Sequence, residues 1–194
     1  MSELRVSMIE RLKTELLKSD RETFPRILGG QTTGDGLWRF FTSNKIGPWN
    51  APKTWRGTWP ELSPELFFFG EDIFGNQLTL KKDSENVWLW NHENGDLVDL
   101  LLDLATLLET VIQSGIDWID FYSPEMLVVG RAKLIDVPEN CHLHWTQPLL
   151  SGGSMTMANT SVVNSTMHLQ GHGSLWTQLR GLPPGTEVII KQKK

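Results

Sequence analysis

The stretch Phe67-Phe-Phe-Gly-Glu-Asp-Ile-Phe-Gly-Asn-Gln-Leu-Thr-Leu80 joins two β-type runs through a segment rich in turn-forming residues. Its second run alternates polar and apolar side chains from Gln77 to Leu80, which predicts a strand with one wet face and one buried face. A third β-type run, Asn86-Val-Trp-Leu-Trp90, follows after a short connector. Because short connectors join strands that are neighbours in a sheet, the sequence predicts an antiparallel meander over residues 65–90.

The segments around this meander carry their own signals. Residues 37–41 are predicted to form a first strand, and residues 4–17 an amphipathic helix, because their apolar side chains recur every four positions. Downstream, the Leu-rich segment 96–113 places its polar residues at helical spacing after an Asn-Gly turn. This pattern predicts a helix with Asp96 as its N-cap.

The chain beyond Ser123 has a different composition, with no charged residue between Glu139 and Arg180. Its apolar runs predict strands at residues 126–129, 133–137, 141–145 and 187–191, and its spacing predicts a helix over 162–179. The fold class is therefore predicted as α+β: an antiparallel β-sheet meander flanked by helices, with a C-terminal α/β extension. Residues 1–123 would form the main domain, and 124–194 an extension that packs on it or forms an oligomer interface.

Composition excludes several classes of protein. The 194 residues carry 18 basic and 23 acidic side chains, a net charge of −5, which argues against a nucleic-acid partner. The longest apolar stretch, residues 97–112, is interrupted by acids and too short to span a membrane. One cysteine, Cys141, gives no disulfide pair, and neither a phosphate-binding loop nor a nucleophile elbow is present. We expect a cytoplasmic protein without a cofactor and without catalytic residues.

Acidic and aromatic side chains on the meander form the candidate partner-binding surface. Residues 1–122 contain 12 basic and 19 acidic residues, a net charge of −7, and an acidic face steers association with a basic partner. The tryptophans of residues 86–90 are two positions apart and so leave one strand face, where they would be apolar anchors if exposed and core residues if not. The candidate contact residues are Glu71, Asp72, Trp88, Trp90, Glu93 and Asp96.

Two further groups of residues carry alternative chemistry. His142 and His144 alternate on a predicted strand, and His168 and His172 share one face of a predicted helix, so four imidazoles could converge on a metal. The loop 42–64 contains Trp49, Trp55 and Trp59 among four prolines. These tryptophans could form a sugar-stacking platform, although anchoring the loop by burial is the better interpretation.

The stretch 67–80, the run Val87-Trp-Leu-Trp-Asn-His-Glu-Asn-Gly95 and the Leu-rich segment after it resemble the SUKH superfamily, which includes the yeast cell-wall assembly regulator family. The resemblance covers about residues 1–122 and is strong over 65–113. It implies an α+β domain without shared catalytic residues. In bacteria such domains mostly serve as immunity proteins that neutralise toxins, often nucleases.

These observations lead to one main hypothesis and two alternatives. The main hypothesis is a non-enzymatic protein-binding domain, either an immunity-type protein that occludes a basic toxin domain or a regulatory interaction protein. The first alternative is a metal-dependent hydrolase that uses His142, His144, His168 and His172. The second is a structural scaffold that oligomerises through its charge-free tail, because interface cores are depleted in charge.

Overall fold

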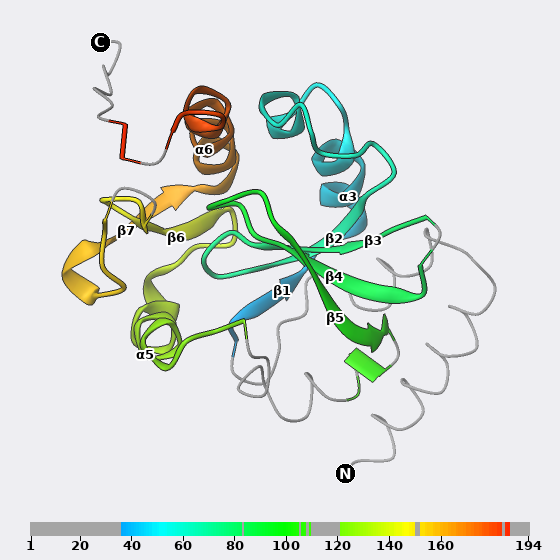
Figure 1. The fold of residues 1–194 in the computed structure, drawn as a ribbon. Helices are drawn as coiled ribbons and strands as arrows, with labels where there is room; N and C mark the ends of the chain where they lie inside the picture. The colour runs from blue at the N-terminus through cyan, green and yellow to red at the C-terminus, as the bar shows by residue number, and fades with distance from the viewer. Residues whose placement is uncertain are drawn as a thin grey trace, which may run out of the picture.

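The computed structural model describes residues 36–82, 84–104, 106–107, 109, 121–149, 152–183 and 185–186. The predicted helix over 4–17 and the predicted strand over 187–191 lie outside these residues. The described fold is α+β, with a large antiparallel sheet, helices around it and a second, small sheet (Figure 1).

The large sheet has the strand order β1-β2-β3-β4-β5, and each neighbouring pair is antiparallel. The predicted meander is therefore confirmed, with the first strand added at its edge. The central strand β3 is paired on both sides, and its side chains are almost all buried. The predicted wet face is therefore wrong: Gln77 and Thr79 are buried, and the Trp49 indole N–H covers that side by donating to the Gln77 amide oxygen at 2.8 Å. The strands are β1 (Trp38–Phe40), β2 (Phe67–Asp72), β3 (Gln77–Leu80), β4 (Asn86–Trp90) and β5 (Leu97–Asp103).

The prediction of a helix starting at Asp96 was wrong over its first turns. Residues Leu97–Asp103 form β5, which pairs with β4 through Trp90 opposite Leu97 and Leu89 opposite Val98. Helical residues begin at Leu104, and the Asp103 carboxylate accepts a hydrogen bond from the Thr106 backbone N–H at 2.7 Å. Asp103 is therefore the N-cap. Apolar residues on a short segment fit either structure, and pairing with β4 selects the strand.

The Trp-rich segment before β2 is folded rather than an extended loop. It contains helix α3 (Ser43–Asn50) and a 3₁₀ helix at Trp55–Thr58. Trp49, Trp55 and Trp59 are all buried. Trp49 packs against Trp55, Trp55 packs against Phe68 and Trp90 of the sheet, and Trp59 meets Trp90 edge-on. The sugar-platform interpretation is therefore wrong, and burial of these rings is confirmed as the reason for their presence.

The tail contains α5 (Pro124–Lys133), a 3₁₀ turn (Leu134–Asp136), β6 (Cys141–Trp145), β7 (Thr160–Asn164) and α6 (Ser165–Leu179). Strands predicted at 126–129 and 133–137 are thus wrong. The Ser123 hydroxyl accepts a hydrogen bond from Met126 N–H, and Pro124 occupies the first turn, so local capping favours a helix there. Strand β6 is confirmed, whereas the helix predicted over 162–179 begins only at Ser165, because β7 pairs with β6.

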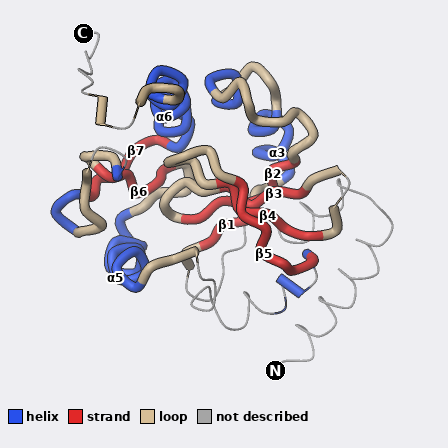
Figure 2. Tube along the Cα trace, viewed as in Figure 1, coloured by secondary structure: helices blue, strands red, loops and turns tan. Residues whose placement is uncertain are grey.

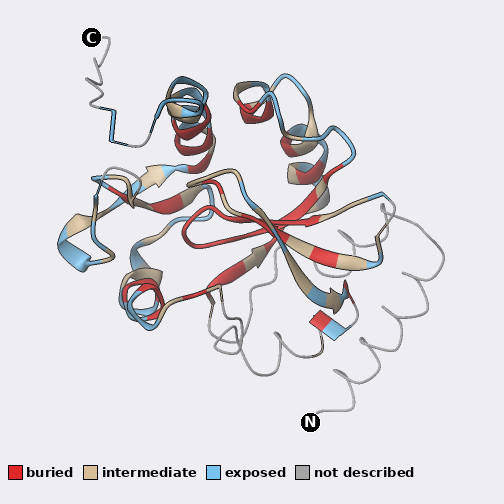
Figure 3. Ribbon diagram, viewed as in Figure 1, coloured by how far each residue is buried: buried red, intermediate tan, exposed pale blue. Residues whose placement is uncertain are grey.

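Sheet and tail share their hydrophobic packing. One core cluster joins residues of β1 to β4, such as Trp38 and Leu89, to Met126 of α5 and to Leu143 and Trp145 of β6. A second cluster joins the tryptophans to Leu169 of α6. Helices α3 and α6 lie on the same side of the large sheet, and buried residues line their inner faces (Figures 1 and 3). No helix among the described residues is long and apolar enough to cross a membrane.

Candidate functional site: a histidine cluster and an adjacent groove

The turn after β2 connects the sheet to the tail. The Ile73 carbonyl accepts a hydrogen bond from Leu143 N–H of β6 at 2.7 Å, and the ring of Phe74 stacks on Trp145. Gly75 has a φ of +100°, and a Cβ there would lie 2.7 Å from His142 Nδ1. Only glycine combines that backbone conformation with so close an approach. The turn is therefore built to receive β6 (Figure 2).

Glu71 is buried within a set of positive and hydrogen-bonding groups. Its Oε2 lies 2.9 Å from His142 Nε2, and its Oε1 lies 2.8 Å from Lys45 Nζ and 3.8 Å from an Arg39 nitrogen. Burial by itself raises the pKa of Glu71, but His142, Lys45 and Arg39 outweigh it and lower the pKa to about 2. Glu71 therefore joins the sheet to the tail as an ionised carboxylate.

Asp72 is buried and organises the same turn. Its Oδ1 accepts hydrogen bonds from the backbone N–H groups of Phe74 and Asn76, and its Oδ2 accepts from the Asn76 amide and the Tyr122 hydroxyl. Burial raises the pKa of Asp72, although the hydrogen bonds from Tyr122 and Asn76 oppose that rise. Each carboxylate oxygen is satisfied, so Asp72 is a structural residue of the turn.

All five histidines of the chain gather beside this turn, and we call them the histidine cluster. The ring centroids of His168 and His172 lie 4.7 Å apart, as their spacing on α6 requires, and that of His92 lies 4.7 Å from His168 and 5.0 Å from His172. His142 and His144 approach His168 at 5.7 and 5.1 Å. The predicted convergence of four imidazoles is thus present, with His92 as a fifth member.

The tautomer of His92 follows from its neighbours. Asn76 donates its amide hydrogen to Asp72, which leaves the Asn76 carbonyl oxygen facing His92 Nδ1 at 3.0 Å. An oxygen can only accept, so His92 Nδ1 donates and His92 Nε2 carries the lone pair. That Nε2 is buried, has no hydrogen-bond partner and lies 3.5 Å from Glu93 Oε1.

The cluster concentrates buried polar atoms without hydrogen-bond partners. Both ring nitrogens of His168, both carboxylate oxygens of Glu93, and Nδ1 of His144 are buried and unpaired in this way. Burial raises the pKa of Glu93 to about 7. Burial lowers the pKa of His168 well below its usual value, with the other histidines adding to the effect, and burial and His144 lower the pKa of His172 to about 4. His168 and His172 are therefore neutral at pH 7, which is the form that binds metals.

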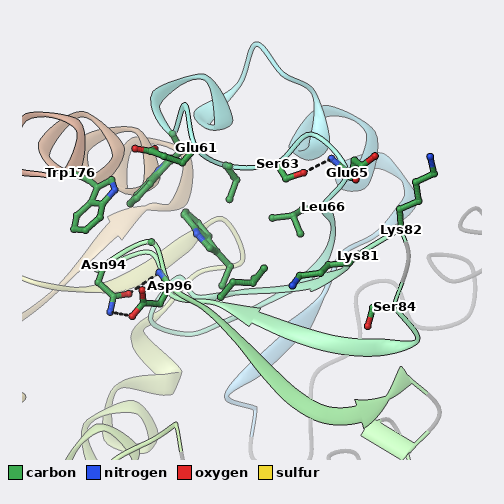
Figure 4. A pocket seen from close by; sticks show the side chains of 15 residues that line it. Glu61, Ser63, Glu65, Leu66, Lys81, Lys82, Ser84, Asn94, Asp96 and Trp176 are labelled. Atoms are coloured by element: carbon green, nitrogen blue, oxygen red, sulfur yellow. Dashed lines mark hydrogen bonds between the residues drawn. The ribbon is translucent and has the colours of Figure 1, made fainter. Parts of the chain in front are cut away.

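A groove of about 580 Å³ lies next to the histidine cluster (Figure 4). The turn that carries His92 and Glu93 continues into Asn94, Gly95 and Asp96 on the groove wall, and α6 contributes Trp176 one turn beyond His172. Figure 4 shows Trp176, Asn94 and Asp96 at one end, and Lys81, Lys82 and Ser84 at the other. Exposed carboxylates of Glu61 and Glu65 also border the groove, and Glu61 pairs with Arg180.

The structure divides the six candidate contact residues among different environments. Glu71, Asp72 and Trp90 are interior, so the expectation that the two carboxylates lie on a contact surface is corrected. Trp88 is half-buried, with the Lys81 ammonium 3.1 Å from its ring centre. Glu93 lies beside His92, and only Asp96 is exposed, at the rim of the groove.

Sequence reasoning missed His92 as a member of the cluster and Trp176 as a wall of the groove. His92 is 50 residues before His142, and no spacing rule connects the two. The one available signal was its place next to Glu93 on a turn after a strand, because functional residues often lie on such loops. Trp176 was assigned to the apolar residues of a helix, and its partial exposure depends on where α6 lies against the sheet.

Comparison with known proteins identifies a shared fold. No protein-family model matches the chain, and no curated protein matches it. Among solved structures, the crystal structure of Atu4351 from Agrobacterium tumefaciens aligns with 90% of this chain and 81% of its own, at a TM-score of 0.53 and 18% sequence identity. At that identity the similarity concerns the fold and not the site. The chain therefore has an α+β fold similar to that of Atu4351.

Proposed function

We propose that this protein is a non-enzymatic binding protein of the immunity type, which neutralises a basic toxin domain, with nucleases as the first class to test. The observation that carries the proposal is the groove beside the histidine cluster, where exposed acids border an aromatic wall. The resemblance of residues 65–113 to the SUKH superfamily supports the same function. A regulatory interaction protein of that superfamily would use the same surface.

The groove has the chemistry of a protein-binding site. Trp176 is the partly exposed aromatic side chain of the groove lining, whereas Trp59 and Trp90 border it as almost fully buried core residues. An aromatic side chain in a pocket carries much of the binding energy in interfaces. Asp96 places a carboxylate at the Trp176 end, where Glu61 is already paired with Arg180. A basic side chain of the partner would bind at that end, with its aliphatic stem against the indole of Trp176.

The charge of the chain favours the same type of partner. Residues 1–122 have a net charge of −7, whereas residues 123–194 have 6 basic and 4 acidic residues, a net charge of +2. An acidic surface accelerates encounter with a basic protein and discriminates against acidic ones. Association should therefore slow as the salt concentration rises.

The test is binding to the toxin encoded beside the gene, measured by calorimetry and by protection of cells that express the toxin. We expect Asp96→Lys to weaken binding about 10-fold and Trp176→Ala about 30-fold, as for a rim charge and a buried aromatic anchor. Asp136→Lys is the matched control, because Asp136 is an exposed acid in the turn after α5, outside the groove lining. Absence of binding and of protection by the unaltered protein would reject the proposal.

A second candidate function is a metal-dependent hydrolase that uses His142, His144, His168 and His172. The convergence of these rings favours it, and His144 is the half-exposed member through which water could reach the cluster. Against it, His142 is buried and already occupied by Glu71. Zinc-loaded protein would have to hydrolyse an ester or phosphodiester substrate, with activity lost in His144→Gln.

The scaffold hypothesis also has an observation in its favour. Met157, Val162 and Met167 of the tail are exposed apolar side chains. Exposed apolar residues that gather on one face would mark an oligomer interface. Analytical ultracentrifugation of the full chain tests this, and a monomer at high concentration would remove the hypothesis.

A further inference from the structure

Three histidines of the cluster present their ligand atoms to one another. One ring nitrogen each from His92, His168 and His172 can be chosen so that all three lie within 4.8 Å of one another. His168 and His172 are one turn apart on α6, and His92 comes from the turn after β4. The three therefore approach one point from two separate elements, as metal ligands do.

We call His92, His168 and His172 the histidine trio. Hydrogen bonds to residues outside the trio orient His92 as a metal ligand would be oriented. Asn76 donates to Asp72, and His92 Nδ1 donates to Asn76, so the His92 imidazole is oriented and its Nε2 lone pair is left without a hydrogen-bond partner. Metal-binding histidines characteristically donate their second nitrogen to such a partner. A histidine held only by packing would not need this arrangement.

The unpaired atoms give the independent argument. His168 has two buried nitrogens without a hydrogen-bond partner, and His92 Nε2 and both Glu93 oxygens are in the same condition. Native proteins rarely bury such groups without a partner, because each loses its hydration on folding. A bound cation would accept these lone pairs together, and the Glu93 carboxylate would supply a negative charge beside it.

We propose that His92, His168 and His172 bind a Zn²⁺ ion, with Glu93 as the fourth ligand, in a structural site that ties α6 to the turn after β4. Three imidazoles and one carboxylate are ligands that Zn²⁺ prefers in tetrahedral sites. Glu93 is chosen because its Oε1 lies 3.5 Å from His92 Nε2 and its side chain is only 11% exposed. The group within 4.8 Å contains the three histidines alone, so the Glu93 side chain has to rotate toward the ion to bind it. The site goes beyond the proposed binding function, and it would brace the wall of the groove, since Asp96 and Trp176 follow these ligands in the chain.

The experiment loads chelator-treated full-length protein with ZnCl₂ alone and measures bound metal by elemental analysis after gel filtration. We expect one Zn²⁺ per chain and a rise in melting temperature. His172→Gln, the most exposed position of the trio, should lower the affinity by about 100-fold or more, and Glu93→Gln by about 10- to 100-fold. CoCl₂ substitution provides a direct readout, since a tetrahedral Co²⁺ site with nitrogen ligands absorbs strongly in the visible range.

His144→Gln is the matched control, because His144 belongs to the cluster but not to the trio. It should retain the stoichiometry and the Co²⁺ spectrum. Failure of the unaltered protein to retain Zn²⁺ would overturn the proposal, as would metal binding that survives in folded His172→Gln. If His144→Gln lost as much Zn²⁺ affinity as His172→Gln, the assignment of the ligands would be overturned. Circular dichroism of each metal-free variant separates loss of ligand from loss of fold.

Discussion

The carboxylate pair Glu71 and Asp72 and the histidine trio His92, His168 and His172 are both buried polar groups at the junction of sheet and tail. They differ in how their hydrogen bonds are satisfied. Each oxygen of the pair has a partner within the chain, whereas His92 and His168 of the trio retain unpaired nitrogens. The comparison teaches that the pair is satisfied by groups of the chain itself, whereas the trio keeps buried nitrogens that the proposed Zn²⁺ ion would satisfy.

The largest effect is expected from removing a carboxylate of the pair. Glu71→Ala leaves His142, Lys45 and Arg39 facing one another without their anion, and breaking a buried ion pair costs about 3–5 kcal/mol. The free energy of unfolding, measured in urea, should fall by that amount. Glu125→Ala, at an exposed acid, should change it by less than about 0.5 kcal/mol. Equal losses of stability in Glu71→Ala and Glu125→Ala would show that Glu71 is not a stabilising buried carboxylate.

The pH dependence of the free energy of unfolding also tests the contribution of ionised Glu71. The pKa of Glu71 is about 2 in the folded protein against an ordinary 4.5, so its contribution is present above pH 4.5 and is lost as the pH falls toward 2. The loss should amount to about 3 kcal/mol. Glu71→Gln should show a flatter profile in this window. Because Asp72 is present in both proteins, the difference between their profiles isolates Glu71.

A smaller effect is expected at the edge of the carboxylate network. The Tyr122 hydroxyl donates to Asp72 and accepts from Trp38 Nε1 at 2.8 Å, so Tyr122→Phe leaves one buried donor and one acceptor short of a partner. The cost should be about 1–3 kcal/mol in the free energy of unfolding. If Tyr122→Phe left the free energy of unfolding unchanged, the hydrogen bonds around Asp72 would not stabilise the fold. The carboxylate pair and the histidine trio would then not differ in their contribution to stability.

The smallest effect is expected within the trio. In chelator-treated protein, His168→Leu removes two unpaired nitrogens and keeps most of the buried volume. The free energy of unfolding should change by less than about 1 kcal/mol in either direction. In the presence of ZnCl₂ the unaltered protein should become more stable, whereas the variant should not. A large loss without metal would show that the trio is held by the chain alone.

Sequence patterns predicted the elements with strong local signals. The alternation over residues 77–80 and the turn-rich connectors were sufficient for the meander, and β6 was predicted at its observed residues. Leu97–Asp103 was not predictable in this way, because leucine suits a helix and the strand arises from pairing with β4. Helix α5 had a readable signal in Ser123 and Pro124, an N-cap followed by a first-turn proline.

The candidate site was predicted in part for a similar reason. The i, i+4 spacing of His168 and His172 and the alternation of His142 and His144 are local, and both put imidazoles on one face. That these faces meet, and that His92 joins them, depends on the packing of β6 and α6 against the sheet. The acidic stretch around Glu71 suggested a charged surface, because the sequence does not reveal which carboxylates have partners in the tail.

The sequence by itself determined the antiparallel meander, the glycine turn after β2 and the helical spacing of two histidines, because these follow from backbone geometry over a few residues. Only the tertiary structure decided that Glu71 and Asp72 lie inside and Asp96 outside, and that His92 faces α6. Burial and hydrogen bonding depend on contacts between residues far apart in the chain. The physical reason is that a carboxylate or imidazole takes its role from the groups packed against it, which local sequence does not specify.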